Sequence, residues 1–244
     1  MVRICVFGSS SNKTPNEYLK LSEELGALIA SNGHLCVNGG GAAGCMGALN
    51  RGVRSKGGQI LGVIHDMFSV ETEDGLIQEM IVSNGDTLSE RKQMLVTNSD
   101  CIIVLPGGVG TLDELWESVC NKSLHLGGME KVPICVLNYN GYFDGSIAQL
   151  ERASKDKLLY QPVSEYMRVE TSAKDALEWS VKALNNNGSN GNVDTAFRKQ
   201  RRDTSFTITN AFKADKLPFV AIGMTIGVVL TSVLFNTTFR KGSY

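Results

Sequence analysis

Short apolar runs alternate with longer amphipathic segments along the first three quarters of the chain. Each run has the length of a β-strand, and its nearly continuous apolar character is typical of a strand buried on both faces. The predicted strands are Val2–Phe7, Leu35–Val37, Gln59–Ile64, Met80–Val82, Cys101–Leu105, Pro133–Leu137 and Met167–Val169.

The segments between these runs carry apolar residues at helical spacing. The predicted helices are Asn16–Ala30, Cys45–Lys56, Thr87–Thr97, Thr111–Ser123, Gly145–Ala153 and Ser172–Leu184. Thr14-Pro15 signals one helix start, and Ser172 with Asp175 resembles a capping box. The alternation predicts an α/β domain over residues 1–184, with a doubly wound, Rossmann-like parallel sheet and helices on both faces.

Composition changes abruptly after Leu184. The stretch from Asn185 to Asn192 has no apolar residue to bury, and Phe197–Lys216 has six basic residues against two acidic ones, so residues 185–216 are expected to be a flexible, partly basic linker. Leu217–Phe235 is then uncharged over 19 residues, about 29 Å if helical, which predicts a C-terminal transmembrane anchor over residues 217–239. The basic flank predicts that the domain is held at a membrane on its cytoplasmic side.

Overall composition excludes several classes of function. The chain has 244 residues and a formal net charge of -1, so no excess of basic charge favours nucleic acid as a partner. Its six cysteines form no C-x-x-C pair, which is typical of reduced thiols in a core. Three histidines without paired spacing predict no metal site.

One glycine-rich turn joins a predicted strand to a predicted helix at Pro106–Glu114. Gly107, Gly108 and Gly110 allow backbone N–H groups to approach a ligand, and a helix N-terminus with Thr111 favours an anion. The turn therefore predicts a phosphate cradle. The spacing leaves two roles open for Glu114, which either closes a capping box with Thr111 or faces the crevice as a catalytic carboxylate.

Two further glycine turns follow the first and second predicted strands. One contains Gly8, Ser9 and Ser10, and the other contains Gly40, Gly41 and Gly44. The carboxyl ends of parallel strands share one edge of a sheet, so all three turns are expected to converge on a nucleotide or sugar phosphate. The alternative is that each glycine only ends a strand. Gly39-x-Gly41-x-x-Gly44 matches the dinucleotide fingerprint only formally, because it follows the second strand and no acidic residue ends the next one.

A basic pair, Arg91-Lys92, lies in the helical segment before the Pro106 turn. Arginine offers a planar fork suited to phosphate or carboxylate, although such a pair on a solvated helix face usually has no special role. Together with Pro-Gly-Gly-x-Gly-Thr-x-x-Glu at Pro106–Glu114, the pair resembles the signature of the Lonely Guy (LOG) family, the cytokinin riboside 5'-monophosphate phosphoribohydrolases once labelled lysine decarboxylases. The similarity runs from Val2 to about Leu184 and includes Asn140–Asp144.

The resemblance implies hydrolysis of the N-glycosidic bond of a purine nucleoside 5'-monophosphate, whose base is an adenine with or without an N6 modification, by a homodimer that needs no cofactor. It assigns catalysis to Glu114 and Arg91. Substrate binding falls to the second basic residue and the three turns, at Lys92, Gly107, Gly108, Gly110, Thr111, Gly40, Gly41, Gly44, Ser9 and Ser10.

The sequence departs from the family pattern near the expected base pocket. Leu88-Ser89 stands where the family commonly has Met-His, and Asn38 replaces an aromatic residue before the three glycines. The competing class is a non-catalytic binding protein for a nucleotide or a molybdenum-type cofactor. A decarboxylase dependent on pyridoxal phosphate is disfavoured, because nothing marks a Schiff-base lysine.

Overall fold

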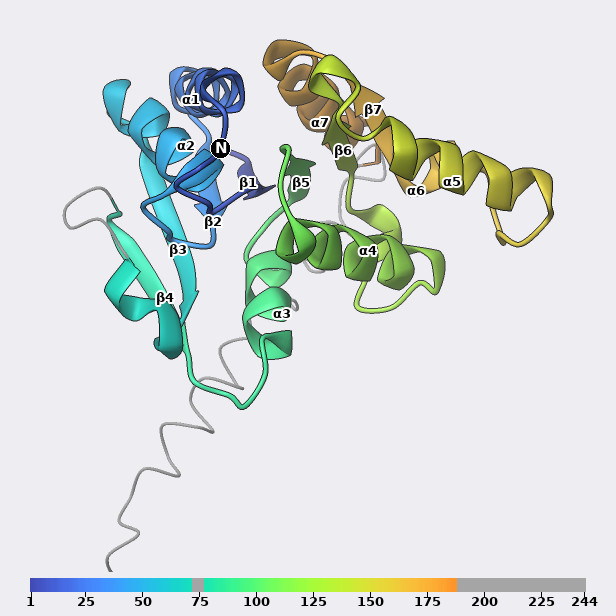
Figure 1. The fold of residues 1–244 in the computed structure, drawn as a ribbon, viewed down its shortest axis with the longest axis horizontal. Helices are drawn as coiled ribbons and strands as arrows, with labels where there is room; N and C mark the ends of the chain where they lie inside the picture. Colours follow the sequence, from blue (N-terminus) through green and yellow to red (C-terminus); the bar gives the residue numbers. More distant parts are fainter. Residues whose placement is uncertain (72–76, 188–244) are drawn as a thin grey trace, which may run out of the picture. The chain divides into compact units, whose positions relative to one another are not determined.

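The computed structural model describes residues 1–71 and 77–187, which form a seven-stranded parallel sheet with helices on both faces (Figure 1). The strand order is β4-β3-β2-β1-β5-β6-β7. The strands are β1 (Arg3–Phe7), β2 (Leu35–Asn38), β3 (Gln59–His65), β4 (Glu79–Ser83), β5 (Cys101–Val104), β6 (Ile134–Leu137) and β7 (Arg168–Glu170). The order reverses between β1 and β5, which creates the switch point where ligands of such sheets bind.

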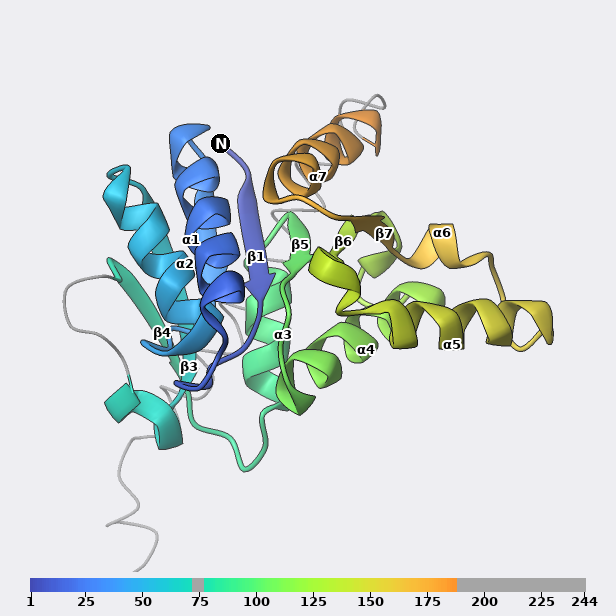
Figure 2. The ribbon, with the colours of Figure 1, turned by 45° about the horizontal axis from the view of Figure 1, so that its top comes forward.

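The helices divide into two layers that bury alternate residues of the strands. They are α1 (Asn16–Ser31), α2 (Gly44–Ser55), α3 (Ser89–Thr97), α4 (Val109–Ser123), α5 (Asp144–Lys155), α6 (Val163–Tyr166) and α7 (Ala173–Asn187). On β1, Ile4 and Val6 pack with α1, α2 and α7, whereas Cys5 and Phe7 pack with α3 and α4. Figure 2 shows α1 and α2 side by side across one face.

Every strand and helix expected from the apolar pattern is present, with bounds shifted by at most three residues. The pattern gave no signal for α6 or for the 3-10 helices η1 (Asp66–Glu71), η2 (Met129–Lys131) and η3 (Tyr139–Gly141), because these elements are too short to show a period. Helix α7 continues to Asn187, three residues beyond the last apolar position at Leu184.

The two predicted helix starts had different outcomes. Ser172 Oγ accepts a hydrogen bond from the Asp175 N–H at 3.1 Å, which is one half of a capping box, and it donates to Asp175 Oδ2 at 2.7 Å. The Thr14 prediction was wrong: Pro15 occupies the N-cap of α1, and the Thr14 hydroxyl instead donates to the Ser11 carbonyl at 2.7 Å. The Thr14 hydroxyl is therefore bound within the serine-rich turn after β1 and does not cap α1.

The predicted anchor, residues 217–239, and nearly all of the predicted linker lie outside the described residues. Within residues 1–71 and 77–187, no helix combines the length and apolar character needed to cross a bilayer.

Candidate active site

A cavity of about 360 Å³ opens at the carboxyl ends of β1, β2, β3 and β5, where the strand order reverses. All three predicted glycine turns contribute to it, as do the helices that carry Arg91 and Glu114. Its lining consists of Gly8, Ser9, Ser10, Ser11, Gly39, Gly41, Met46, Ile64, Phe68, Leu88, Arg91, Gly108, Val109, Gly110, Thr111 and Glu114. Residues separated by more than 100 positions in the sequence thus share one cleft.

The Pro106 turn delivers the N-terminus of α4 to this cleft. Gly108 is the N-cap, and its carbonyl accepts the first helical hydrogen bond from Leu112 N–H at 3.0 Å. The backbone N–H groups of the first turn precede that bond and have no acceptor within the helix, so they favour an anion. The capping-box alternative for Glu114 was wrong, because the helix starts two residues before Thr111 and no side chain caps it.

Glu114 instead faces Arg91 from the opposite wall. Arg91 Nη1 lies 3.4 Å from Glu114 Oε1, and the Arg91 Nε donates to the Val63 carbonyl at 3.0 Å. The two side chains are only 12% and 13% exposed. The carbonyl at the end of β3 therefore fixes the guanidinium beside the carboxylate.

Burial raises the pKa of Glu114 to about 7, and the charge of Asp113 raises it as well, while Arg91 and Lys92 act in the opposite direction. A carboxyl group with this pKa exchanges a proton readily at neutral pH, which is the property of a general acid or base. Its position in a cleft with an anion-binding helix end makes it the candidate catalytic group.

The cleft is lined by two kinds of side chain. Ser9, Ser10, Ser11 and Thr111 contribute hydroxyl groups. Met46, Ile64, Phe68 and Leu88 contribute apolar side chains. The predicted site missed these four residues, because apolar side chains near a strand end carry no chemical signal in a sequence.

Four of the predicted binding residues support the cleft rather than line it. The Lys92 ammonium lies 2.9 Å from Asp113 Oδ2 and also contacts Glu117 on α4. Gly107, Gly44 and Gly40 are the other three. A Cβ on Gly107 would overlap Thr111 Oγ1, and one on Gly44 would overlap the Ser9 carbonyl, so both glycines let the turns pack together.

Asn38, the departure noted before the three glycines, is fully buried and holds the second turn. Its amide Nδ2 donates to Asn50 Oδ1 at 2.7 Å, and its Oδ1 accepts from the Gly40 N–H at 2.8 Å. Asn50 in turn donates to the Gly41 carbonyl at 3.3 Å. The side-chain amides of Asn38 and Asn50 therefore hold the backbone of the second glycine turn in place.

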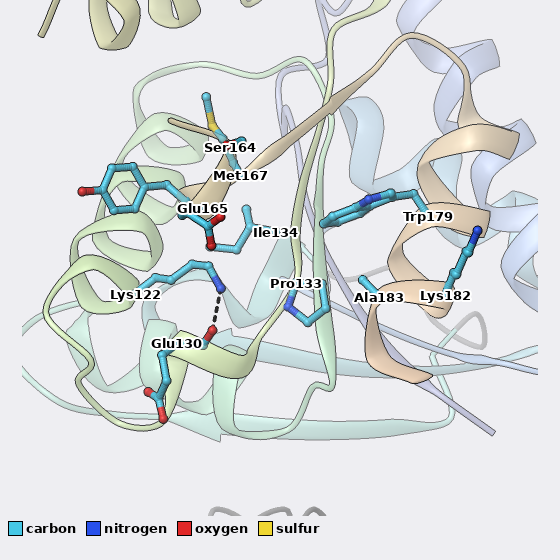
Figure 3. A pocket seen from close by; sticks show the side chains of 11 residues that line it. Lys122, Glu130, Pro133, Ile134, Ser164, Glu165, Met167, Trp179, Lys182 and Ala183 are labelled. Atoms are coloured by element: carbon cyan, nitrogen blue, oxygen red, sulfur yellow. Dashed lines mark hydrogen bonds between the residues drawn. The ribbon is translucent and has the colours of Figure 1, made fainter. Parts of the chain in front are cut away.

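A larger cavity, of about 480 Å³, lies at the amino end of β6, away from the glycine turns (Figure 3). Trp179 and Lys182 of α7 line one side, and Lys122 lines the other. The Lys122 ammonium donates to the carbonyls of Glu130 and Val132 at 2.9 and 3.0 Å, and burial lowers its pKa. This lysine therefore holds the backbone turn at Glu130–Val132.

The fold and the cleft define a class: an α/β protein that binds a phosphate-bearing ligand beside a buried carboxylate. The model of the family described as "Possible lysine decarboxylase" matches residues 46–179. A cytokinin riboside 5'-monophosphate phosphoribohydrolase of Mycobacterium tuberculosis is 40% identical over 69% of this chain and 88% of its own length. A probable enzyme of the same name from Oryza sativa subsp. japonica is 30% identical over 72% and 70%. The chain belongs to the Lonely Guy family.

Solved structures show the same fold at lower identity. The molybdenum cofactor binding protein of Rippkaea orientalis has a TM-score of 0.56 at 22% identity, covering 75% of this chain and 96% of that one. The molybdenum cofactor carrier protein of Chlamydomonas reinhardtii has the same TM-score and identity, covering 75% and 98%. At this identity the likeness concerns the fold alone.

Proposed function

We propose that this protein hydrolyses the N-glycosidic bond of a purine nucleoside 5'-monophosphate and releases the free base and ribose 5-phosphate. The observation that carries the proposal is that Arg91 Nη1 and Glu114 Oε1 lie 3.4 Å apart in a cleft that also contains the N-terminus of α4 and four apolar side chains. Relatives named for this activity, and the family itself, support it.

The cleft suits each part of such a substrate. The 5'-phosphate accepts hydrogen bonds at the N-terminus of α4 and from Ser9, Ser10 and Thr111. The base contacts the apolar side chains of the cleft. Cleavage develops positive charge on the ribose ring, which the Glu114 carboxylate stabilises. Water adds to the anomeric carbon and loses a proton to Glu114, and the bond electrons leave with the purine nitrogen, which takes up a proton.

Arg91 holds Glu114 in place and favours its ionised form, because its positive charge lowers the pKa that burial raises. The two residues therefore act as a unit. Binding energy from the remote phosphate fixes the reacting carbon beside the carboxylate.

The test is product analysis with the full chain. AMP and N6-isopentenyl-AMP are supplied separately, and free base and ribose 5-phosphate are measured. Glu114→Gln should abolish turnover but still bind AMP. Glu117→Gln is the matched control, because Glu117 contacts Lys92 outside the cleft. Absence of both products from the folded wild-type chain would overturn the proposal, as would full activity of Glu114→Gln.

The apolar side chains that line the cleft support a preference for adenine with an apolar N6 substituent. Met46, Ile64, Phe68 and Leu88 offer such a group more favourable contact than the polar amine of AMP. The ratio of kcat/KM for N6-isopentenyl-AMP over AMP measures this preference, and a ratio at or below one contradicts it.

The alternative is a nucleotide or molybdenum-cofactor binding protein without catalysis. The structural neighbours with that description share the fold, but phosphate binding alone gives no reason for a buried carboxylate beside the anion site. Saturable AMP binding without product release would favour this alternative.

We further propose that the protein forms a homodimer and is held at a membrane by residues 217–239, with its domain on the cytoplasmic side. The dimer is proposed on the family resemblance. The uncharged run and its basic flank support the anchor. Light scattering of the detergent-solubilised chain measures the oligomeric state.

A further inference from the structure

Tyr142 contacts the predicted phosphate-binding turn at a residue that does not line the cleft. Its hydroxyl donates a hydrogen bond of 2.6 Å to the Gly107 carbonyl. Gly108 lines the cavity, whereas Gly107 and Tyr142 do not. The phenol therefore binds one end of a peptide group whose other residue, Gly108, lies in the cleft that the proposed function uses for the 5'-phosphate.

The hydrogen bond acts on the far side of the same peptide group. The Gly107 carbonyl and the Gly108 N–H share one planar peptide, and the described residues contain no cis peptide bond. In a trans peptide the C=O and N–H point in opposite directions. A carbonyl held by Tyr142 thus directs the Gly108 N–H toward the cleft.

This control matters because the turn has little rigidity of its own. Gly107 and Gly108 are adjacent glycines, and glycine has more backbone freedom than any other residue. Without an external contact, the peptide between them can rotate and turn its N–H away from an anion. The hydrogen bond that the Gly107 carbonyl accepts from Tyr142 restricts that rotation.

The sequence holds Tyr142 in place through the segment that joins β6 to α5. Asn140 and Gly141 both adopt left-handed backbone angles, with φ of 53° and 72°. Asn138 Oδ1 accepts from the Phe143 N–H at 2.7 Å, which closes the turn. The Tyr142 ring then packs edge-to-face on Tyr18 and Phe143, with ring centroids 5.6 and 4.9 Å away.

We propose that Tyr142 is a positioning residue that aims the Gly108 amide at the 5'-phosphate of the substrate. The identity of that ligand rests on the proposed function, but the prediction concerns phosphate binding and not hydrolysis. A net hydrogen bond contributes about 0.5–1.5 kcal/mol, so loss of the phenol hydroxyl should weaken phosphate binding by about 2- to 13-fold.

The test is Tyr142→Phe in the full chain, which removes the hydroxyl and keeps the ring. The dissociation constants of ribose 5-phosphate and of adenosine, which lacks the phosphate, are measured by calorimetry. We expect weaker binding of ribose 5-phosphate, unchanged binding of adenosine, and a higher KM for AMP with kcat nearly unchanged. Tyr139→Phe is the matched control, because it removes a hydroxyl of η3 that lies outside the contact with Gly107.

Equal binding of ribose 5-phosphate by Tyr142→Phe and the wild type would overturn the inference. So would equal weakening of ribose 5-phosphate and adenosine, since that pattern indicates a general loss of structure, and so would a wild-type chain that binds no ribose 5-phosphate. If AMP is not hydrolysed but the expected binding pattern holds, the proposed function fails and the role of Tyr142 stands.

Discussion

Burial of Glu114 opposes the charge that its proposed role requires. With a pKa raised to about 7, mainly by burial, the carboxylate form becomes dominant only above neutral pH. We predict that kcat/KM rises as the pH increases from 5 through 7 and levels off above about pH 8. Asp113→Asn should shift this profile to lower pH, because the Asp113 charge raises the pKa of Glu114. Glu117→Gln is the control, and an unchanged profile in Asp113→Asn contradicts the prediction.

The same pKa shift means that ionised Glu114 lowers the free energy of unfolding at alkaline pH. A folded pKa above the unfolded value means that the folded state binds more protons between about pH 4.5 and 7. Stability from this group is therefore fully present below pH 4.5 and is lost as the pH rises through 7, by up to about 3 kcal/mol.

We predict that Glu114→Gln removes this pH-dependent part of the unfolding free energy. Urea unfolding of the wild type and of Glu114→Gln at pH 5 and pH 8 measures it. The wild type should lose more stability than the variant between the two pH values. Parallel losses in both proteins would show that Glu114 titrates normally.

Gly39 controls the position of Arg91 by having no side chain. A Cβ there would overlap Arg91 Nη2 and lie 2.9 Å from Met46 Sδ. Both atoms belong to flexible side chains, so Gly39→Ala should displace the guanidinium while the fold remains intact. We predict a loss of about 10²-fold in kcat with little change in melting temperature. Gly145→Ala, where a Cβ would meet nothing within 4 Å, is the control. Full activity of Gly39→Ala would contradict the prediction.

The sequence motifs identified Arg91 and Glu114 but not the distance between them. That distance depends on the Val63 carbonyl, a backbone atom that no motif names. For Lys92, the motif predicted a place in the cleft that the structure does not give it. Its neighbour Arg91 enters the cleft, but adjacent residues of a helix point about 100° apart, and Lys92 contacts α4 instead.

At the scale of elements, close packing of α1 on α2 positions the turn that precedes α2. A Cβ on Gly26 would overlap the Leu49 carbonyl oxygen and lie 2.9 Å from Val53 N. These are backbone atoms of α2 and cannot move aside as a side chain does. We predict that Gly26→Ala forces the helices apart and destabilises the protein by about 1–3 kcal/mol or more.

Urea unfolding measures this cost, again with Gly145→Ala as the control, which should lie between no change and a gain of about 1 kcal/mol. A Gly26→Ala variant as stable as the wild type would show that α1 and α2 separate freely. The amphipathic pattern predicted both helices, yet it gave no indication of the spacing between them. Helix spacing depends on which small residues face each other, and the apolar period does not reveal that.

At the scale of the whole molecule, the predicted order of strands and helices was sufficient to predict that the three glycine turns line one cleft. Parallel strands bring their carboxyl ends together, so the turns after β1, β2 and β5 had to converge. The apolar residues that line the cleft could not be predicted in this way. Phe68 lies on η1, which is too short to have a period, and Leu88 precedes a helix whose polar surface dominates its pattern.

The proposed membrane anchor should be independent of catalysis, because the described residues that line the cleft all lie between Gly8 and Glu114. Charges at the centre of a membrane-spanning segment cost about 2.5–3.5 kcal/mol each. We predict that Val228→Arg with Val229→Asp releases the chain from membranes without changing kcat/KM for AMP. Val228→Ile with Val229→Leu is the control. Sedimentation of carbonate-washed membranes gives the bound fraction, and retention of the charged variant would contradict a spanning segment at residues 217–239.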